Sequence, residues 1–312
     1  MQGRSVLVTG AAGFIGSNVA NHLAPDNDVI GIDDGSLGVP VHLDDAVDYR
    51  EIDVVDSDIP ADVDVVIHLA ARSSYAMHEA HAAEGARVNI EGFVNVVEQA
   101  KESGCETIVY ASTSSVYGSR TQPSPESLPV TARSGYEASK LARERYAEYF
   151  NAHYGMNLAG LRFFSVYQGY GGAESHKGKY ANVVAQFADD LANGKRPELY
   201  GDGTQTRDFT HVDDVVRAIE LAADHKLDGV YNVGTGKPVD FTTLVELLND
   251  ALGTDITPRY VDNPIPASIY VTHTCADYAK LNAATGWEPE ISLDEGIDRV
   301  CRQYRQEAAI ER

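Results

Sequence analysis

Short apolar runs alternate with longer amphipathic segments through the first half of the chain. The runs predict buried strands at residues 6–8, 29–32, 63–69, 107–111 and 158–164, and the amphipathic segments predict helices at about 14–23, 88–103 and 136–154. Strands that alternate with helices indicate an α/β fold with a doubly wound parallel sheet of the Rossmann type. Ligands of such sheets bind beyond the carboxyl ends of the strands.

The pattern changes after residue 165, because residues 168–180 are rich in Gly, Tyr and charge. Helices are predicted at about 180–193, 242–252 and 292–306. We expect a Rossmann domain formed by 1–165 plus about 208–236. A smaller, discontinuous substrate-binding lobe would consist of 166–207 plus 237–312.

A glycine-rich turn follows the first predicted strand, with Gly10, Gly13 and Gly16 spaced as G-x-x-G-x-x-G. Gly10 permits a sharp turn, Gly13 leaves room for a pyrophosphate against backbone N–H groups, and Gly16 allows close packing of the helix on the sheet. A purely structural turn is the alternative. Asp33, at the end of the second strand, is placed to accept hydrogen bonds from ribose hydroxyls and to repel a 2′-phosphate, which favours NAD over NADP.

Three other polar residues, Asp53 and the pair His78 and His81, allow more than one interpretation. Asp53 ends a short apolar stretch, where it would either accept a hydrogen bond from the adenine amino group or serve as an ordinary turn residue. His78 and His81 are spaced i,i+3 and lack the His-Glu-x-x-His pattern of zinc hydrolases. We therefore expect these histidines on a solvated helix face, and the sequence predicts no metal site.

The predicted helix at 136–154 carries the candidate catalytic pair. Tyr136 and Lys140 lie four residues apart and share a helix face, so the ammonium would favour the ionised phenol. Tyr136 is thereby a candidate general base near neutral pH. Thr113 belongs to a hydroxyl-rich run after a central strand, where it would hold a substrate oxygen or simply cap the strand.

The chain of 312 residues carries a formal net charge of −22, from 47 acidic and 25 basic residues. Such a field repels nucleic acids and anionic membranes. It is typical of a soluble acidic protein or, more specifically, of a halophilic one whose self-repulsion is screened by concentrated salt. No apolar run approaches the length of a membrane span. Three dispersed cysteines and an N-terminus without a signal peptide favour the cytoplasm.

Several motifs together resemble the extended short-chain dehydrogenase/reductases, specifically the nucleotide-sugar epimerases and dehydratases that are similar to UDP-glucose 4-epimerase. They are the glycine turn, 68–71 (His-Leu-Ala-Ala), Asn89-x-x-Gly92, the Thr113 run, Tyr136-x-x-x-Lys140, 161–164 and 201–209. The resemblance implies bound NAD, with Tyr136 as the base, Lys140 on the nicotinamide ribose and Thr113 on the reacting oxygen. The implied cofactor-binding residues are Gly10, Gly13, Phe14, Ile15, Gly16, Asp33, Asp53, Val54, Leu69, Ala70, Ala71, Tyr136 and Lys140.

The resemblance also implies a substrate site. Asn182 and Val183 would contact the diphosphate, Tyr200 would line the base and Arg207 would pair with a phosphate. Lys177, Lys179 and Lys195 would add positive charge for the anion, or the first two would belong to a solvated loop, which we expect for them. Ser165 stands where hexose epimerases carry Asn and some uronate epimerases carry Thr, so the sugar stays open. The implied substrate-binding residues are Thr113, Ser165, Asn182, Val183, Tyr200 and Arg207.

The residues after Thr113 indicate which reaction the chain catalyses, because they lack the acidic groups of other family enzymes. Family dehydratases carry Asp-Glu after this Thr and decarboxylases carry Glu at position 115, whereas this chain has Ser114 and Ser115. We therefore predict an NAD-dependent 4-epimerase acting on a UDP-hexose or UDP-hexuronate. The alternatives are a dehydratase or reductase of the same family and a non-catalytic NAD-binding regulator. By resemblance, the helices at 89–103 and 136–154 would form a homodimer interface.

Overall fold

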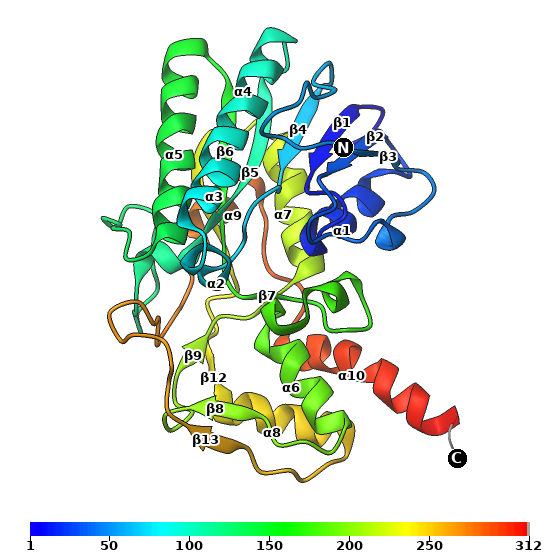
Figure 1. The fold of residues 1–312 in the computed structure, drawn as a ribbon, viewed down its shortest axis with the longest axis vertical. Helices are drawn as coiled ribbons and strands as arrows, with labels where there is room; N and C mark the ends of the chain where they lie inside the picture. The colour runs from blue at the N-terminus through cyan, green and yellow to red at the C-terminus, as the bar shows by residue number, and fades with distance from the viewer. Residues whose placement is uncertain (311–312) are drawn as a thin grey trace.

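A seven-stranded parallel sheet forms the centre of the upper part of the molecule (Figure 1). The structure is a computed structural model that describes residues 1–310. The strand order is β11-β6-β5-β4-β1-β2-β3, and every neighbouring pair is parallel. The predicted fold class is therefore confirmed. The strands are β1 (Ser5–Thr9), β2 (Asp28–Asp33), β3 (Asp48–Glu51), β4 (Val65–His68), β5 (Thr107–Thr113), β6 (Asn157–Phe163) and β11 (Gly229–Val233).

Helices cover both faces of this sheet. Successive side chains of a strand point to opposite faces, so apolar strands present apolar side chains on both faces, and both need to be buried. Val6 and Val8 of β1 face a core shared with α1 (Phe14–Leu23) and α7 (Val212–Asp224). Leu7 faces the opposite core, shared with α4 (Gly92–Glu102) and α5 (Gly135–Tyr154). Sheets buried on both faces have nearly continuous apolar strands, which explains why the sequence pattern located most of these strands.

The smaller lobe below the sheet contains helices α6 (Val183–Ala192), α8 (Phe241–Leu252) and α10 (Leu293–Ile310), which share one apolar core (Figure 1). Its strands form two-stranded pairs: β8 (Glu198–Tyr200) with β13 (Arg259–Val261), and β9 (Thr206–Arg207) with β12 (Val239–Asp240). Strand β7 (Val166–Tyr167) pairs with β10 (Thr210–His211) between the lobe and the sheet. The remaining helices are α2 (Tyr75–Glu79), α3 (Ala82–Ala86) and α9 (Ala279–Thr285), and short helical turns span Pro40–His42, Arg87–Glu91, Ser114–Tyr117 and Ala173–Tyr180.

Several predicted boundaries were wrong for identifiable reasons. The helix predicted at 88–103 begins with a π-helical turn, in which the buried Asn89 bonds to backbone groups of Arg72. The helix predicted at 180–193 starts only at Val183, because Asn182 caps it by accepting from the Val184 N–H group. The sequence pattern missed β3, whose polar sequence lies at the sheet edge, as well as β11 and α7.

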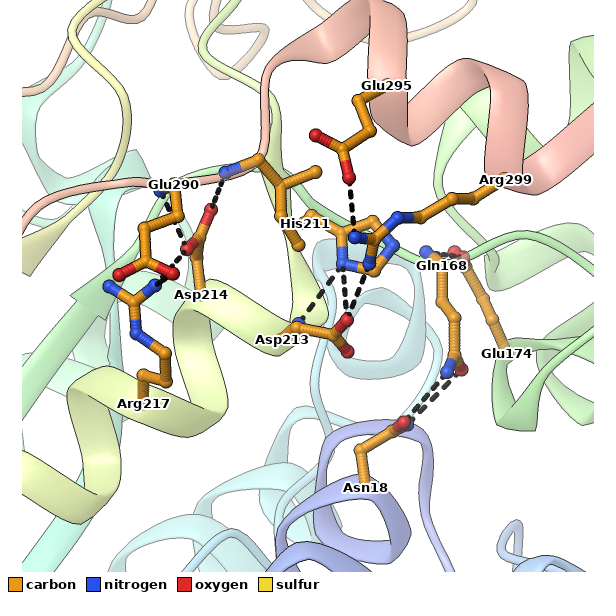
Figure 2. Close-up of polar contacts among 11 residues, drawn as sticks. Asn18, Gln168, Glu174, His211, Asp213, Asp214, Arg217, Glu290, Glu295 and Arg299 are labelled. Carbon is orange, nitrogen blue, oxygen red and sulfur yellow. Dashed lines mark hydrogen bonds and ion pairs between the residues drawn. The ribbon is translucent and has the colours of Figure 1, made fainter.

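Polar contacts join the lobe to the sheet (Figure 2). The buried carboxylate of Asp214 on α7 accepts from the backbone N–H groups of Glu290 and Ile291, which precede α10. Arg299 on α10 bonds to Asp213 at 2.8 Å. These contacts fix the position of α10 relative to α7. The boundaries of the predicted domains stay a proposal. No helix within residues 1–310 is long and apolar enough to cross a membrane.

Candidate active site

A cavity of about 500 Å³ opens at the carboxyl edge of the sheet. Its walls come from the ends of β1, β2, β4, β5 and β6 and from the start of α5, as expected of a doubly wound sheet. The lining includes every predicted cofactor-binding residue together with the predicted substrate residues Thr113 and Ser165. Segments that lie far apart in the sequence therefore meet around one space.

The glycine turn forms one end of this cavity. Gly10 has φ +70°, and a Cβ atom there would lie 2.7 Å from the Ala70 nitrogen, so another residue would not fit. A Cβ atom at Gly16 would overlap the Gly10 carbonyl oxygen. Gly13 is the N-cap of α1, which has neither a capping side chain nor an acidic residue in its first turn. The N–H groups in the first turn of α1, which follow Gly13, suit the pyrophosphate of a dinucleotide.

Two aspartates lie at the far end of β2 and β3. The buried Asp33 accepts from the N–H groups of Ala12 (3.2 Å) and Gly35 (3.0 Å), and burial raises the pKa of Asp33 despite these bonds. Asp53 also lines the cavity, but its Oδ1 atom accepts from the Val55 N–H group at 2.9 Å. The turn role of Asp53 is thus observed, and its contact with adenine stays a prediction.

The capped start of α5 holds the candidate catalytic pair. The Ser134 hydroxyl accepts from the Glu137 N–H group, so Tyr136 lies in the first turn. The buried Lys140 ammonium donates to the Ala111 carbonyl oxygen (3.0 Å) and lies 5.9 Å from the centre of the Tyr136 ring. Thr113 ends β5 with its hydroxyl 2.9 Å from that of Ser115.

The electrostatics of this pair differ from the prediction. Burial raises the pKa of Tyr136, and the Thr113 hydroxyl and the Arg143 charge lower it by less. Burial and the Arg143 charge hold the pKa of Lys140 well below its usual value. The expectation of a lowered phenol pKa was therefore wrong for the protein groups alone, because burial outweighs the Thr113 hydroxyl and the Arg143 charge.

A strap formed by residues 168–182 closes one side of the cavity, and the sequence did not reveal its role. The fully buried carboxylate of Glu174 accepts from the N–H groups of Gln168, Gly169 and Asn182. The side-chain amides of Gln168 and Asn18 form a reciprocal pair that ties the strap to α1 (Figure 2). An internal carboxylate with three backbone donors fixes a loop that would otherwise move.

The strap brings Lys177 to the cavity wall, 5.8 Å from the centre of the Phe14 ring at the start of α1. Burial lowers the pKa of Lys177. The prediction of a solvated loop was therefore wrong for Lys177, whereas Lys179 is exposed although it also borders the cavity. Other lining residues that the sequence did not single out include Ser36, Arg72, Ser73, Met77, His176 and Tyr180.

The structure places the remaining predicted substrate residues outside this cavity, in the lobe. The Arg207 guanidinium lies between the rings of Phe241 (5.5 Å) and Tyr270 (5.6 Å), and the Tyr270 ring packs against that of Tyr200. Among the described side chains, no carboxylate forms an ion pair with Arg207. Asn182 caps α6 and donates to the Val166 carbonyl oxygen, and Val183 begins that helix half-buried.

Two residues of the cavity region have unusual conformations or surroundings. Ser165 has φ +32°, a conformation that is costly for a residue with a side chain and tends to occur at functional sites. His78 is buried against Tyr136, so the prediction of a solvated helix face was wrong for His78, although His81 is exposed. Within the described residues, no cluster of three or more His, Cys, Asp or Glu side chains has the arrangement of a metal site.

Comparison with known proteins decides the family. The sequence model of the NAD dependent epimerase/dehydratase family matches residues 6–234. The chain belongs to this family. A putative UDP-glucose 4-epimerase from Methanocaldococcus jannaschii is 33% identical over 303 residues, covering 95% of this chain and 96% of the relative. The predicted family, NAD as cofactor and an epimerase activity are thereby confirmed.

Solved structures of family members agree with this assignment to the family. A UDP-N-acetylglucosamine 4-epimerase from Methanobrevibacter ruminantium, in complex with UDP-N-acetylmuramic acid, superposes with a TM-score of 0.90 at 30% identity and covers 98% of this chain and 100% of its own. A UDP-glucose 4-epimerase from Thermus thermophilus in complex with NAD has a TM-score of 0.84 at 29% identity, with 96% and 99% coverage. The glycine turn and Asp33 fit the cofactor of this family.

Proposed function

We propose that this family member is a 4-epimerase of a UDP-hexose or UDP-hexuronate, with Tyr136 as its general base. The observation that carries the proposal is the convergence of Thr113, Tyr136 and Lys140 on the cavity that the glycine turn and Asp33 also line. NAD, when bound, supplies a hydride acceptor and the positive charge of its nicotinamide ring.

Each side chain has a separate task in this reaction. Thr113 holds the 4-hydroxyl oxygen, and Tyr136 removes its proton as the sugar is oxidised to a 4-ketone. After the sugar has presented its other face, Tyr136 returns the proton to the new hydroxyl. Lys140 is anchored on the Ala111 carbonyl oxygen beside the Tyr136 ring and keeps a cation next to the phenolate. General base catalysis of this kind contributes about 100- to 10,000-fold.

The residues that follow Thr113 differ from those of the family dehydratases, and this difference favours epimerisation over dehydration. Ser114 and Ser115 place hydroxyls next to Thr113, whereas the acidic residues of the cavity wall are Asp33, Asp34 and Asp53, at the β2 and β3 ends. A dehydratase needs an acid beside the sugar to remove water. A purely regulatory NAD-binding protein would not need the buried Lys140 beside a phenol.

We propose that the diphosphate and base of the substrate occupy the lobe around Arg207. A guanidinium between two aromatic rings, without a carboxylate partner among the described side chains, is a cation suited to an anionic ligand. Tyr200 and Tyr270 provide flat apolar surface for a base. The sugar would then extend from the lobe toward Thr113.

A panel of UDP-, dTDP- and GDP-sugars, with products separated by chromatography, tests this assignment. We expect interconversion of a UDP-sugar with its C4 epimer and no net NADH release. A 4-keto-6-deoxy product would show a dehydratase, and accumulating NADH would show a dehydrogenase. NAD bound in the protein without any product would support the regulatory alternative.

We also propose a homodimer formed through α4 and α5. Tyr146, Tyr149 and Tyr154 of α5 are exposed by 42%, 43% and 49%, and Ile90, Val94 and Tyr146 line a shallow groove beside them. Figure 1 shows α4 and α5 side by side at one edge of the molecule. Light scattering should give twice the chain mass. Tyr149→Glu should yield monomer, whereas Tyr260→Glu, at an equally exposed tyrosine of β13, should not.

A further inference from the structure

A buried histidine lies behind the proposed catalytic base. His78 of α2 is 2% exposed, and its imidazole ring meets the Tyr136 ring edge-on, with centroids 5.7 Å apart and an interplanar angle of 64°. His78 follows β4 in the sequence, whereas Tyr136 begins α5. The contact therefore joins α2 to the start of α5, where Tyr136 lines the cavity.

Asn89 connects His78 to its surroundings. The Asn89 Oδ1 atom accepts from the Arg72 N–H group at 2.8 Å, so the Nδ2 amide group faces the other way. That group lies 2.9 Å from the Ser139 hydroxyl oxygen, 3.0 Å from His78 Nε2 and 3.1 Å from the Arg72 carbonyl oxygen. These contacts hold the imidazole ring in place from the side opposite Nδ1.

The charges around His78 keep it neutral. Lys140 and Arg143 face it from α5 and Arg72 from the segment after β4, with Glu84 of α3 lying 3.9 Å from Arg72. Burial, with these three cations, lowers the pKa of His78 and outweighs a hydrogen bond to the Arg72 backbone, which raises it. The net effect opposes the charged form.

Gly85 of α3 provides the space for this ring. A Cβ atom at Gly85 would overlap the Nδ1 and Cε1 atoms of His78. His78 Nδ1 has no hydrogen-bond partner among the described residues. Burying this nitrogen without a partner costs folding free energy. A buried ring with an unpaired nitrogen, fitted over a glycine, indicates a task beyond filling space.

We propose that neutral His78 is a positioning residue that holds the ring of Tyr136 in the orientation needed for proton transfer. The inference rests on the proposed function, in which Tyr136 is the base. The edge of the imidazole limits rotation of the phenol away from Thr113 and Lys140. Edge-to-face aromatic pairs contribute an amount that corresponds to about a 2- to 12-fold effect.

Three variants separate the contact with the ring from the hydrogen bond to Asn89. His78→Phe keeps an aromatic ring, His78→Gln keeps an acceptor for Asn89, and His78→Ala keeps neither. We expect kcat to fall about 10-fold in the Ala and Gln variants with little change in KM, and to stay within about 2-fold in the Phe variant. Unchanged kcat in His78→Ala, or recovery by Gln but not by Phe, would overturn the proposal.

The pH dependence gives a readout that loss of packing alone would not move. In the wild type, protonation of His78 should add a decline of kcat on the acid side, at a pH below the usual histidine value of about 6.5. His78→Phe should remove that decline while NAD content and melting temperature stay constant. An identical acid limb in both proteins would contradict positioning by a neutral imidazole.

A second substitution tests the same contact from the other side. Gly85→Ala should lower kcat about 10-fold in the wild type but have little effect in His78→Ala, because the overlapping ring is then absent. Ala83→Gly, on the exposed part of α3, is the matched control. Equal effects of Gly85→Ala in both backgrounds would overturn the proposal. Tyr136→Phe in the same assay checks the proposed function independently, since full turnover there would reject Tyr136 itself as base.

Discussion

The two halves of the proposed active site are built differently. In the cofactor half, the proposed ligand groups come from short contiguous motifs at the ends of neighbouring strands, and backbone N–H groups at the start of α1 would provide the anion site. In the lobe, Arg207, Phe241 and Tyr270 come from three segments that no local motif connects. The first half depends on backbone geometry, whereas the second depends on single side chains.

This difference predicts how each half tolerates substitution. Changes in the cofactor half should remove either chemistry or NAD. Changes in the lobe should weaken substrate binding and leave NAD in place. The following experiments test that contrast in order of decreasing expected effect.

Tyr136→Phe should abolish most turnover while preserving the fold and NAD content. Removing the phenolic oxygen eliminates the general base, so we expect kcat to fall at least about 100-fold. Steady-state kinetics with the identified sugar, together with the absorbance of bound NAD, measures both quantities. Tyr149→Phe, at an exposed tyrosine of the same helix, is the control, and comparable losses in the two variants would contradict a specific role of Tyr136.

Arg207→Ala should affect substrate binding alone. Loss of a hydrogen-bonded charge typically costs about 1.5–3 kcal/mol, which corresponds to a 10- to 100-fold rise in KM for the UDP-sugar. NAD content should be unchanged, because Arg207 lies outside the cofactor cavity. Arg302→Ala, at an exposed arginine of α10, should behave as wild type. Loss of NAD in Arg207→Ala would contradict the proposed separation of cofactor binding from substrate binding in the lobe.

The two halves should also respond differently to acid. Burial raises the pKa of Asp33, so this carboxylate becomes protonated at a higher pH than an ordinary aspartate, whose pKa is about 3.9. A protonated Asp33 cannot accept from both ribose hydroxyls, and NAD affinity should fall as the pH decreases toward this raised pKa. UDP-sugar affinity should stay flat over the same range, because Arg207 remains charged. Calorimetric titrations across pH would show this, and Asp33→Asn should remove the NAD dependence.

Lys177→Ala should cause a smaller change, of about 3- to 10-fold, in the retention of NAD. The strap places this cation beside Phe14 at the pyrophosphate end of the cavity, but its partial exposure to solvent weakens the interaction. NAD release after dilution, followed by fluorescence, provides the measurement. Lys195→Ala, at an exposed lysine after α6, serves as the control. A rise in KM without faster NAD loss would assign Lys177 to the substrate half.

The smallest expected effect concerns the whole surface. We propose that the net charge of −22 reflects a high-salt cytoplasm, so molar KCl should raise the melting temperature by several degrees through screening. Thermal unfolding in dilute buffer and in molar KCl tests this. Equal melting temperatures in the two buffers would contradict the high-salt proposal and favour an ordinary acidic protein.

The sequence determined five of the seven strands of the sheet, the glycine turn and the Tyr136–Lys140 pair, because each depends on residues close together in the chain. Short apolar runs, a strand–turn–helix junction and i,i+4 spacing are local properties that geometry converts directly into structure. Even there, the direction of the Tyr136 pKa shift was wrong, since burial is not visible in a motif.

Only the tertiary structure decided the surroundings of these groups. The buried His78, the strap that carries Lys177 and the aromatic rings around Arg207 depend on contacts between segments far apart in the sequence. Such contacts follow from the packing of whole elements, which no short pattern of residues specifies. A lone histidine or a lysine in a glycine-rich loop has the same local sequence signal whether it is solvated or buried, and folding alone separates the two.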